Sequence, residues 1–192
     1  TPIPRTLAMI LYCDLDISVI DELPKGRQPV ETYAVGTGMR TRIYKFIAGE
    51  ISAGHQAYIV CPLAENDDGE TQPDELMSAR EYADSLKNTP LSGTRIAYIH
   101  GKMKPSEKDR IMTDFALHQI DVLVSTTVIE VGVNVPNATV MFIENAERFG
   151  LSQLHQLRGR VGRGQDKAYC ILLSPLMKKA KGSGKPDSPF AK

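Results

Sequence analysis

Arginine and glycine are concentrated in one short stretch, residues 156–164, which reads QLRGRVGRG and holds three of each. Arginines so close together repel one another, and glycines cost chain entropy on folding. A guanidinium group keeps its charge and presents paired donors that suit phosphate. Because residues three apart share a face of a helix, Arg160 and Arg163 are expected to point the same way. The stretch predicts an anion site approached closely by backbone; the alternative is a solvated helix end whose cations the helix dipole favours.

Two further polar motifs follow predicted strands. His100, Gly101 and Lys102 come after one strand, and Ser125 and Thr126 begin a run of three hydroxyl side chains after the next. Hydroxyl groups and free amides at a helix start can donate to phosphate, although capping is the commoner use of serine and threonine there. A surface turn explains the glycine and lysine equally well. In open parallel sheets ligands gather beyond the carboxyl ends of the strands, so these motifs and the arginine stretch could converge along one edge.

The sequence lacks the parts that a nucleotide-hydrolysing domain needs for itself. It contains no GxxxxGK[ST] segment to cradle phosphates and no acidic pair for magnesium. The tail segment GSGKP, residues 182–186, lacks the first glycine of that pattern, and proline follows its lysine. The arginines are therefore expected to serve a phosphate held by another domain or subunit, or the phosphates of a nucleic acid.

Short apolar runs alternate with helix-like stretches along the chain. Strands are predicted at residues 31–35, 56–61, 94–99, 121–125, 139–144 and 168–173, and helices at residues 40–53, 74–87, 105–117 and 152–161. Several runs are continuously apolar, as strands buried on both faces must be. The alternation predicts an α/β fold with a parallel sheet flanked by helices. We expect a connector at residues 1–30, one domain at residues 31–175 and a flexible tail at residues 176–192.

The composition is that of a globular protein: of 192 residues, 42% are hydrophobic and 24% charged, with a formal net charge of zero. No apolar run is long enough to span a membrane, so no membrane partner is expected. Cys13, Cys61 and Cys170 form no CxxC pair and are expected to be buried, reduced thiols of a cytosolic protein. The histidines share no metal-ligand spacing, so no metal site is assigned. The chain begins without methionine and is expected to be a fragment.

These motifs resemble those of superfamily 2 helicases. The arginine stretch is similar to the family's sixth motif, QxxGRxGR, and residues 125–136 resemble the fifth. Residues 59–63 resemble the fourth motif, and residues 1–7 the end of the third. Residues 14–27 and 125–164 narrow the resemblance to branched-DNA helicases of the RecG type. Transcription-repair coupling factors share TPIPRTL and HQLRGRVGR, and their equivalent domain is the alternative.

The resemblance covers about residues 1 to 175 and implies a RecA-like motor domain, the second of two, without a P-loop of its own. ATP and Mg²⁺ would be held mainly by the first motor domain, which in this family lies upstream together with a wedge domain that grips the branch. The full protein would remodel stalled forks and Holliday junctions in double-stranded DNA during recombination and repair. It would act as a monomer in the bacterial cytoplasm, at the nucleoid. This chain alone would be inactive.

The resemblance also implies roles for individual residues. Arg160 and Arg163 would be arginine fingers, which stabilise charge on the γ-phosphate of an ATP bound across a cleft. Gln156, Gly132 and Asn134 would join them at the nucleotide. Asn134 stands where most relatives have aspartate, so it can hydrogen-bond but brings no charge. DNA contacts would come from Ser125, Thr126, His100, Gly101 and Lys102.

Two other interpretations compete with the motor domain. A nucleic-acid binding module would use the same arginines on phosphate without any role for ATP. The sequence has no tryptophan, and no aromatic side chain lies among the basic motifs to stack on bases. A purely structural domain would need the arginines only at a helix end, and the three glycines of the stretch argue against that use.

Overall fold

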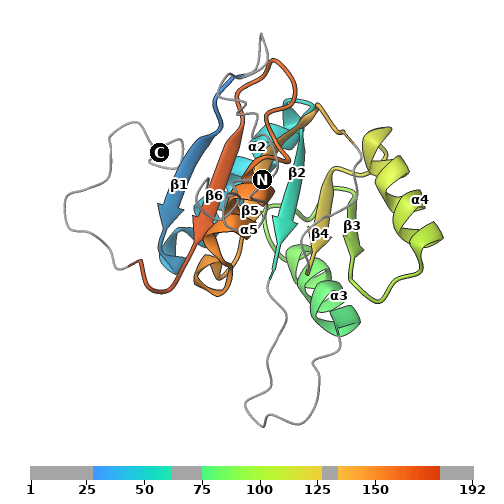
Figure 1. The fold of residues 1–192 in the computed structure, drawn as a ribbon, viewed down its shortest axis with the longest axis horizontal. Helices are drawn as coiled ribbons and strands as arrows, with labels where there is room; N and C mark the ends of the chain where they lie inside the picture. Colours follow the sequence, from blue (N-terminus) through green and yellow to red (C-terminus); the bar gives the residue numbers. More distant parts are fainter. Residues whose placement is uncertain (1–27, 62–74, 127–133, 178–192) are drawn as a thin grey trace, which may run out of the picture.

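A six-stranded sheet forms the centre of the computed structural model, which describes residues 28–61, 75–126 and 134–177 (Figure 1). All neighbouring strands are parallel, in the order β1-β6-β5-β2-β4-β3. The strands are β1 (Glu31–Val35), β2 (Gln56–Val60), β3 (Ile96–Ile99), β4 (Val122–Ser125), β5 (Ala138–Ile143) and β6 (Tyr169–Leu173). The predicted α/β fold with a parallel sheet is confirmed.

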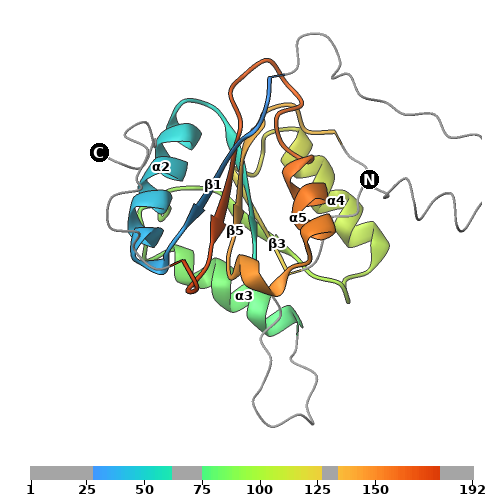
Figure 2. The same ribbon diagram turned by 60° about the vertical axis from the view of Figure 1, so that its left-hand side comes forward.

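Helices cover both faces of this sheet. Within the described residues they are α2 (Arg40–Ser52), α3 (Glu75–Leu86), α4 (Pro105–Ala116) and α5 (Leu151–Arg158), with short 3-10 helices η1 (Thr37–Met39) and η2 (Ala146–Arg148). Helices α2 and α3 lie on one face, and α4 and α5 lie on the other (Figure 2). The division follows from right-handed connections, which place a helix above or below the sheet according to the direction of crossing. The chain crosses toward β3 through α2 and α3 and returns through α4 and α5.

Local sequence signals explain where some elements begin. Helix α4 starts where it was predicted, with Pro105 in its first turn, where a missing N–H costs nothing, and Glu107 nearby, where the helix dipole favours an acid. Strand β3 begins at Ile96, two residues later than predicted. The reason is that the Thr94 hydroxyl donates to the Leu91 carbonyl oxygen, 2.8 Å away, and holds the chain in the preceding turn.

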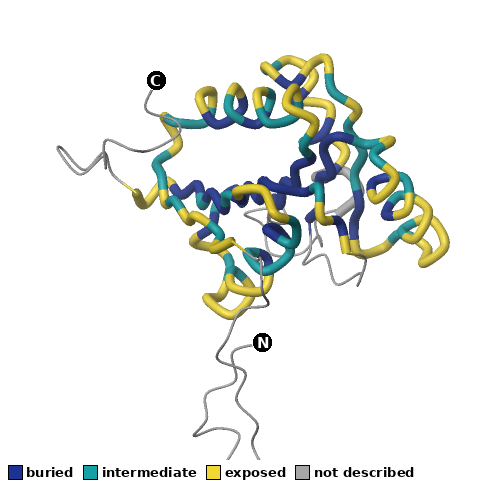
Figure 3. The backbone as a smooth tube through the Cα atoms, turned by 90° about the horizontal axis from the view of Figure 1, so that it is seen from above, coloured by how far each residue is buried: buried dark blue, intermediate teal, exposed yellow. Residues whose placement is uncertain are grey.

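Two apolar cores lie on the two faces of the sheet. Ala57 and Ile59 of β2 face α2 and α3, whereas Tyr58 and Val60 face α4 and α5. All of β2 is buried, which is why its apolar run is continuous instead of alternating. Figure 3 shows this buried layer in the middle of the molecule, with exposed helix surfaces outside it. Because the core fixes the strand ends, polar residues that flank the strands are confined to two edges of one rigid sheet.

The expected domain bounds fall largely on residues that the structure does not describe. The connector at residues 1–30 is described only from Gln28, and the tail at residues 176–192 only to Met177. The sheet itself begins at Glu31 and ends at Leu173. The boundaries of connector and tail stay predictions.

Candidate phosphate-contacting sites

The direction of α5 determines where the arginines lie. This helix starts after β5, at the carboxyl edge where the strands end, and runs antiparallel to the strands to reach the start of β6. Arg158 is its last residue, and Arg160 and Arg163 lie in the loop before β6, here called the arginine loop (residues 159–168). The arginine loop is therefore at the amino edge of the sheet, where the strands begin (Figure 1).

Two glycines of the arginine loop are required by its packing. Gly162 has a φ of 68°, in the left-handed region, and a β-carbon there would come within 2.9 Å of Val30 Cγ2. Gly164 lies against the segment before β5, where a β-carbon would be 2.8 Å from the carbonyl oxygen of Pro136. The glycine density of the stretch thus has a structural cause, close backbone packing, in addition to any ligand that the loop admits.

Asn134 lies at the same edge as the arginine loop. It is exposed and stands just before β5, two residues ahead of Pro136. The contact between Pro136 and Gly164 sets the Asn134 segment beside the arginine loop. Gln156 is exposed in the last turn of α5, ahead of that loop. Gly132 lies outside the described residues, so its expected place beside them stays a prediction.

The two candidate arginine fingers lie in the arginine loop, shortly after the end of α5. Arg160 and Arg163 are both half-buried. Arg163 Nε donates to the Gly159 carbonyl oxygen, 3.2 Å away, which ties its side chain to the end of α5. Burial raises the pKa of Tyr58, a core residue of β2, to about 12, and the positive charges of Arg163 and Arg160 oppose that rise. The predicted helix over residues 152–161 ends at Arg158, so Arg160 and Arg163 do not share a helix face, and the expectation that they point the same way stays a prediction.

The remaining candidates lie at the opposite, carboxyl edge. His100 follows β3 and Thr126 follows β4, and the pairing of Ile99 with Ser125 makes them neighbours. His100 is 5% exposed and Thr126 3% exposed. Among the described residues, His100 Nδ1 and Thr126 Oγ1 are buried atoms without a hydrogen-bond partner. Such atoms are uncommon, because burying a polar group without a partner is costly.

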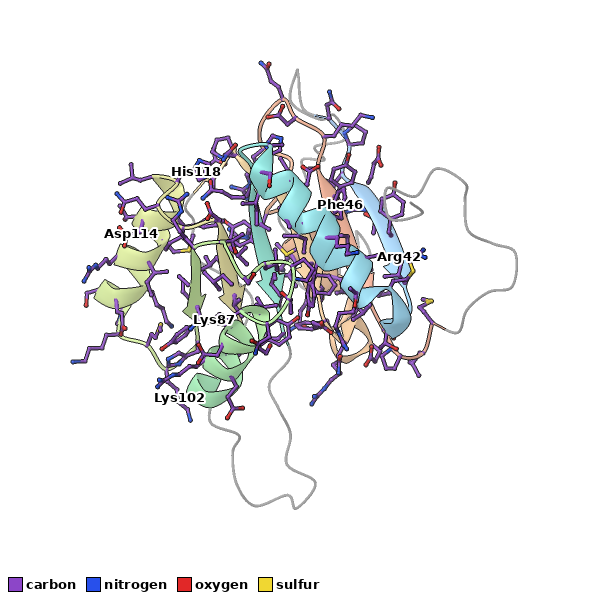
Figure 4. All side chains as sticks on the ribbon, turned by 180° about the vertical axis from the view of Figure 1, so that it is seen from behind. Arg42, Phe46, Lys87, Lys102, Asp114 and His118 are labelled. Atoms are coloured by element: carbon purple, nitrogen blue, oxygen red, sulfur yellow. The ribbon has the colours of Figure 1, made fainter. Side chains whose placement is uncertain are left out.

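The turn after His100 is more accessible to solvent than His100 and Thr126 are. Gly101 and Lys102 are exposed, and Figure 4 shows Lys102 at this edge. The Met103 N–H donates to the His100 carbonyl oxygen, 3.2 Å away, and closes the turn. The hydroxyl of Thr126, in contrast, is enclosed, so a ligand would reach it only if its cover moved. Lys102 and the Gly101 backbone are the candidates that solvent already reaches.

The sequence suggested that all three motifs could converge along one edge, and this is wrong. A helix that connects two parallel strands runs antiparallel to them, so a motif at its end lies at the amino edge. Motifs that directly follow a strand lie at the carboxyl edge instead. The structure therefore separates the arginine loop and the Asn134 segment from the two groups that begin at His100 and Ser125.

One polar cluster at the carboxyl edge was not predicted from the sequence. Glu144, directly after β5, is 3% exposed and accepts hydrogen bonds from Arg40 and from the hydroxyls of Tyr82 and Tyr44. Burial raises the pKa of both tyrosines, and the Glu144 charge adds to that rise. A glutamate at the end of a continuously apolar run was the available signal, because a buried charge requires partners.

The described residues contain no group of three His, Cys, Asp or Glu side chains that could hold a metal ion. No helix among them is both long and apolar enough to cross a membrane. Cys61 and Cys170 are free and buried, as predicted, and burial raises the pKa of each thiol to about 12. Cys13 lies outside the described residues.

Comparison with known proteins identifies the class of this domain. Residues 39–165 match the family described as the helicase conserved C-terminal domain, and the chain belongs to that family. A structure of S. cerevisiae Dbp5 bound to RNA and ADP BeF3 superposes with a TM-score of 0.56 at 16% sequence identity, over 88% of this chain and 41% of that one. At such low identity the likeness concerns the fold alone, the RecA-like parallel sheet of helicase C-terminal domains.

Within this class the chain is similar to RecG helicases, which confirms the resemblance drawn from the motifs. ATP-dependent DNA helicase RecG of Bacillus subtilis (strain 168) is 49% identical over 174 residues, which are 91% of this chain and 25% of the relative. RecG of Escherichia coli O157:H7 is 51% identical over 183 residues, which are 94% of this chain and 26% of the relative. A structure of RecG bound to a three-way DNA junction gives a TM-score of 0.75 at 48% identity, over 91% of this chain and 22% of that one. The chain thus spans about a quarter of the length of these relatives.

Proposed function

We propose that this chain is the C-terminal motor domain of an ATP-dependent DNA helicase that remodels branched DNA, including stalled forks and Holliday junctions. The similarity to RecG helicases supports the class of enzyme. The similarity to a RecG that was solved bound to a three-way DNA junction supports a branched DNA substrate. The observation that carries the proposal is the contact between Gly164 and Pro136, which sets the arginine loop beside the Asn134 segment at one edge of the sheet.

In this proposal the side chains at the amino edge of the sheet contact an ATP that is bound to another domain. Guanidinium groups and a side-chain amide are donors suited to phosphate and sugar oxygens. The donor set does not suit a metal, since the described residues offer no cluster of metal ligands. Mg²⁺ would neutralise charge on the phosphates and, with the ATP, would be held mainly outside this chain. Arg160 and Arg163 would place positive charge where the transferring oxygens become more negative, which lowers the barrier to hydrolysis.

In this proposal the arginines lie on this domain and the P-loop lies on another motor domain. Hydrolysis is therefore coupled to the motion of one domain relative to the other. Arg163 is tied to the end of α5 through Gly159, and α5 is packed on the sheet through Leu157. The arginines therefore move with this whole domain and reach phosphate only when the cleft to the other motor domain closes. Closure that completes a catalytic site is a common way for a motor to link turnover to movement.

The carboxyl edge contacts DNA in the same proposal. Lys102 and the exposed turn at Gly101 would meet backbone phosphates, which carry no base information and suit a translocase. Ser125 and Thr126, which are buried at the end of β4, would join them if their cover moved. The other domains of the helicase would grip the branch, and the enzyme would work as a monomer.

The test is Arg163→Ala in a protein that joins this chain to its upstream motor domain. ATP turnover should fall by about a thousandfold or more, as for loss of other arginine fingers, while affinity for a three-way DNA junction stays within about twofold. Arg158→Ala is the matched control, because Arg158 belongs to the same stretch but contacts His155 at the helix end, 3.1 Å away. Weakened junction binding with normal turnover would favour the nucleic-acid binding module.

A further inference from the structure

Arg40 and Glu144 form an ion pair at the carboxyl edge. Glu144 directly follows β5, and Arg40 is the first residue of α2. Arg40 Nε lies 2.9 Å from Glu144 Oε1, and Arg40 Nη2 lies 2.9 Å from Oε2. The side chain of Glu144 is 4% exposed, whereas that of Arg40 is 43% exposed. A buried carboxylate therefore fixes a guanidinium whose other side faces solvent.

The pairing leaves part of the guanidinium available. Arginine carries five N–H donors in a rigid planar fork. The bonds to Glu144 use the side of the fork formed by Nε and Nη2. The end of the fork, formed by Nη1 and the outer hydrogen of Nη2, can take a second oxyanion through two parallel bonds. The hydrogen bonds that Arg40 donates to Glu144 raise the pKa of Arg40, so the positive charge persists.

The charges around Arg40 also favour an anion. The first turn of α2 contains no acid but holds both Arg40 and Arg42. Cations at this end of a helix are disfavoured, because its free N–H groups already carry partial positive charge. Glu144 compensates Arg40 alone, and Arg42 is exposed on the α2 surface (Figure 4). The first turn of α2 thus carries two positive charges and no acid.

Glu144 belongs to a row of polar residues that crosses the carboxyl edge. Strand pairing continues past the strand ends through N–H bonds of Glu144 to Val60 (2.8 Å), of Cys61 to Ser125 (2.9 Å) and of Thr126 to Ile99 (3.4 Å). These bonds align four residues in one row: Glu144, Cys61, Thr126 and His100. Each of them directly follows one of the four adjacent strands β5, β2, β4 and β3.

The far end of this row points to a ligand independently of Arg40. Among the described residues, three buried side-chain atoms lack a hydrogen-bond partner: His55 Nδ1, which lies before β2 at the amino edge, and His100 Nδ1 and Thr126 Oγ1, which lie at this end of the row. The exposed Lys102 lies just beyond these two. Adjacent strands lie about 4.8 Å apart, so Glu144 and His100 are separated by roughly 14 Å. A nucleic-acid backbone that lies along the edge can therefore contact Arg40 beside one end of the row and Lys102 beside the other.

We propose that Arg40 is a further contact to a DNA phosphate, fixed for that purpose by Glu144. The ligand is a phosphodiester of the DNA backbone, bound without regard to base sequence. Glu144 is a positioning residue, which orients the guanidinium and does not touch DNA. The inference rests on the proposed function, because it adds a second contact to the same DNA-facing edge as Lys102.

The chain supplies a matched control at the other edge. Arg95 directly precedes β3, and its Nε lies 3.1 Å from Oδ2 of Asp121, which directly precedes β4. The side chains of Arg95 and Asp121 are 56% and 10% exposed. This pair resembles Arg40 and Glu144 in chemistry and burial but lies at the amino edge. Loss of Arg95 should therefore disturb folding to a similar degree without removing a DNA contact.

The experiment measures affinity for a synthetic three-way DNA junction at several salt concentrations, in the protein that joins this chain to its upstream motor domain. Arg40→Gln should weaken binding about tenfold, as expected for loss of a charged hydrogen-bonded contact. It should also reduce the salt dependence of log K by about 0.9, the value for one phosphate contact. Arg95→Gln should change neither quantity. An unchanged salt dependence in Arg40→Gln would overturn the proposal.

A second variant separates DNA binding from folding. Arg40→Gln leaves the Glu144 charge buried without its cationic partner, although the tyrosine hydroxyls remain, and this lowers the melting temperature. The double variant Arg40→Gln/Glu144→Gln removes that unpaired charge, so the melting temperature should recover while the loss of affinity and of salt dependence persists. Recovery of both would make Arg40 a structural residue and reject the contact. If the unaltered protein fails to bind the junction, the proposed function itself falls, which is a distinct outcome.

Discussion

Gly164 packs directly on Pro136, so closely that a β-carbon on Gly164 would lie 2.8 Å from the Pro136 carbonyl oxygen. This contact joins the two segments that carry the candidate nucleotide contacts, since Arg163 precedes Gly164 and Asn134 lies two residues before Pro136. It sets the spacing between the arginine loop and the start of β5. A side chain at position 164 must therefore shift one segment away from the other.

We expect Gly164→Ala to slow ATP turnover in the joined protein by about tenfold to a hundredfold, because displacement of catalytic groups by about 1 Å has effects of this size. Steady-state hydrolysis at saturating ATP and DNA measures it. Gly49→Ala is the control, since a β-carbon there meets nothing within 4 Å in the exposed part of α2. That variant should keep normal turnover and gain about 0.5–1 kcal/mol in the free energy of unfolding. Normal turnover in Gly164→Ala would show that the contact does not position the arginines.

Tyr82→Phe should destabilise the domain by removing a donor from a buried carboxylate while keeping the ring. The Tyr82 hydroxyl lies 2.8 Å from Glu144 Oε1, whereas that of Tyr44 lies at 3.4 Å. We expect a loss of about 1.5–3 kcal/mol in the free energy of unfolding for Tyr82→Phe, the range for hydrogen bonds to charged groups. Tyr44→Phe should lose less, because its bond to Glu144 is longer and its 2.9 Å bond with the Tyr82 hydroxyl joins two neutral groups. Urea denaturation measures both, and equal losses would contradict this assignment of the hydrogen bonds.

Asp121→Asn should cost stability in a manner that depends on pH. Hydrogen bonds from the Arg95 guanidinium lower the pKa of Asp121, an effect larger than the rise that burial causes. A lowered carboxyl pKa stabilises the folded state above the ordinary value of 3.8, and that stability is lost as the pH falls through the lower folded value. The variant should therefore be less stable than the unaltered domain at pH 7, by about 1.5–3 kcal/mol.

The difference between the two proteins should shrink as the pH falls below 3.8, when measured by urea denaturation across an acid series. Asp84→Asn is the control, because Asp84 is exposed and its pair with Lys87 lies on the surface. Exposed pairs add little stability. A stability gap for Asp121→Asn that stays constant with pH would reject the charge of Asp121 as its cause.

Much of the fold was predictable from residue types. Continuous apolar runs such as β2 are buried on both faces and gave strand positions close to the observed ones. The parallel arrangement followed from their alternation with helices. Strand β3 started late because the Thr94 side chain bonds its own preceding turn, an interaction that a run of apolar residues does not reveal.

The arrangement of the candidate sites was less predictable. The arginines were recognisable from charge and spacing. The edge of the sheet at which they lie depends on the direction of α5, and the motif by itself does not contain that direction. The Glu144 cluster brings together residues up to 104 positions apart, so no local pattern contains it. Only the register of the strands shows that Glu144 and His100 stand in one row.

Arginines that act on an ATP held by another domain are tested by ATP hydrolysis of this chain alone, with and without a three-way DNA junction, compared with hydrolysis by the chain joined to its upstream motor domain. The chain alone should show no turnover, because it has no P-loop, and the joined protein should show turnover that the junction stimulates. That result would fit arginines lent across a cleft. Hydrolysis by the chain alone, abolished in its Arg163→Ala variant, would mean that a complete nucleotide site lies within these residues and would rule out arginines that act only on an ATP held elsewhere.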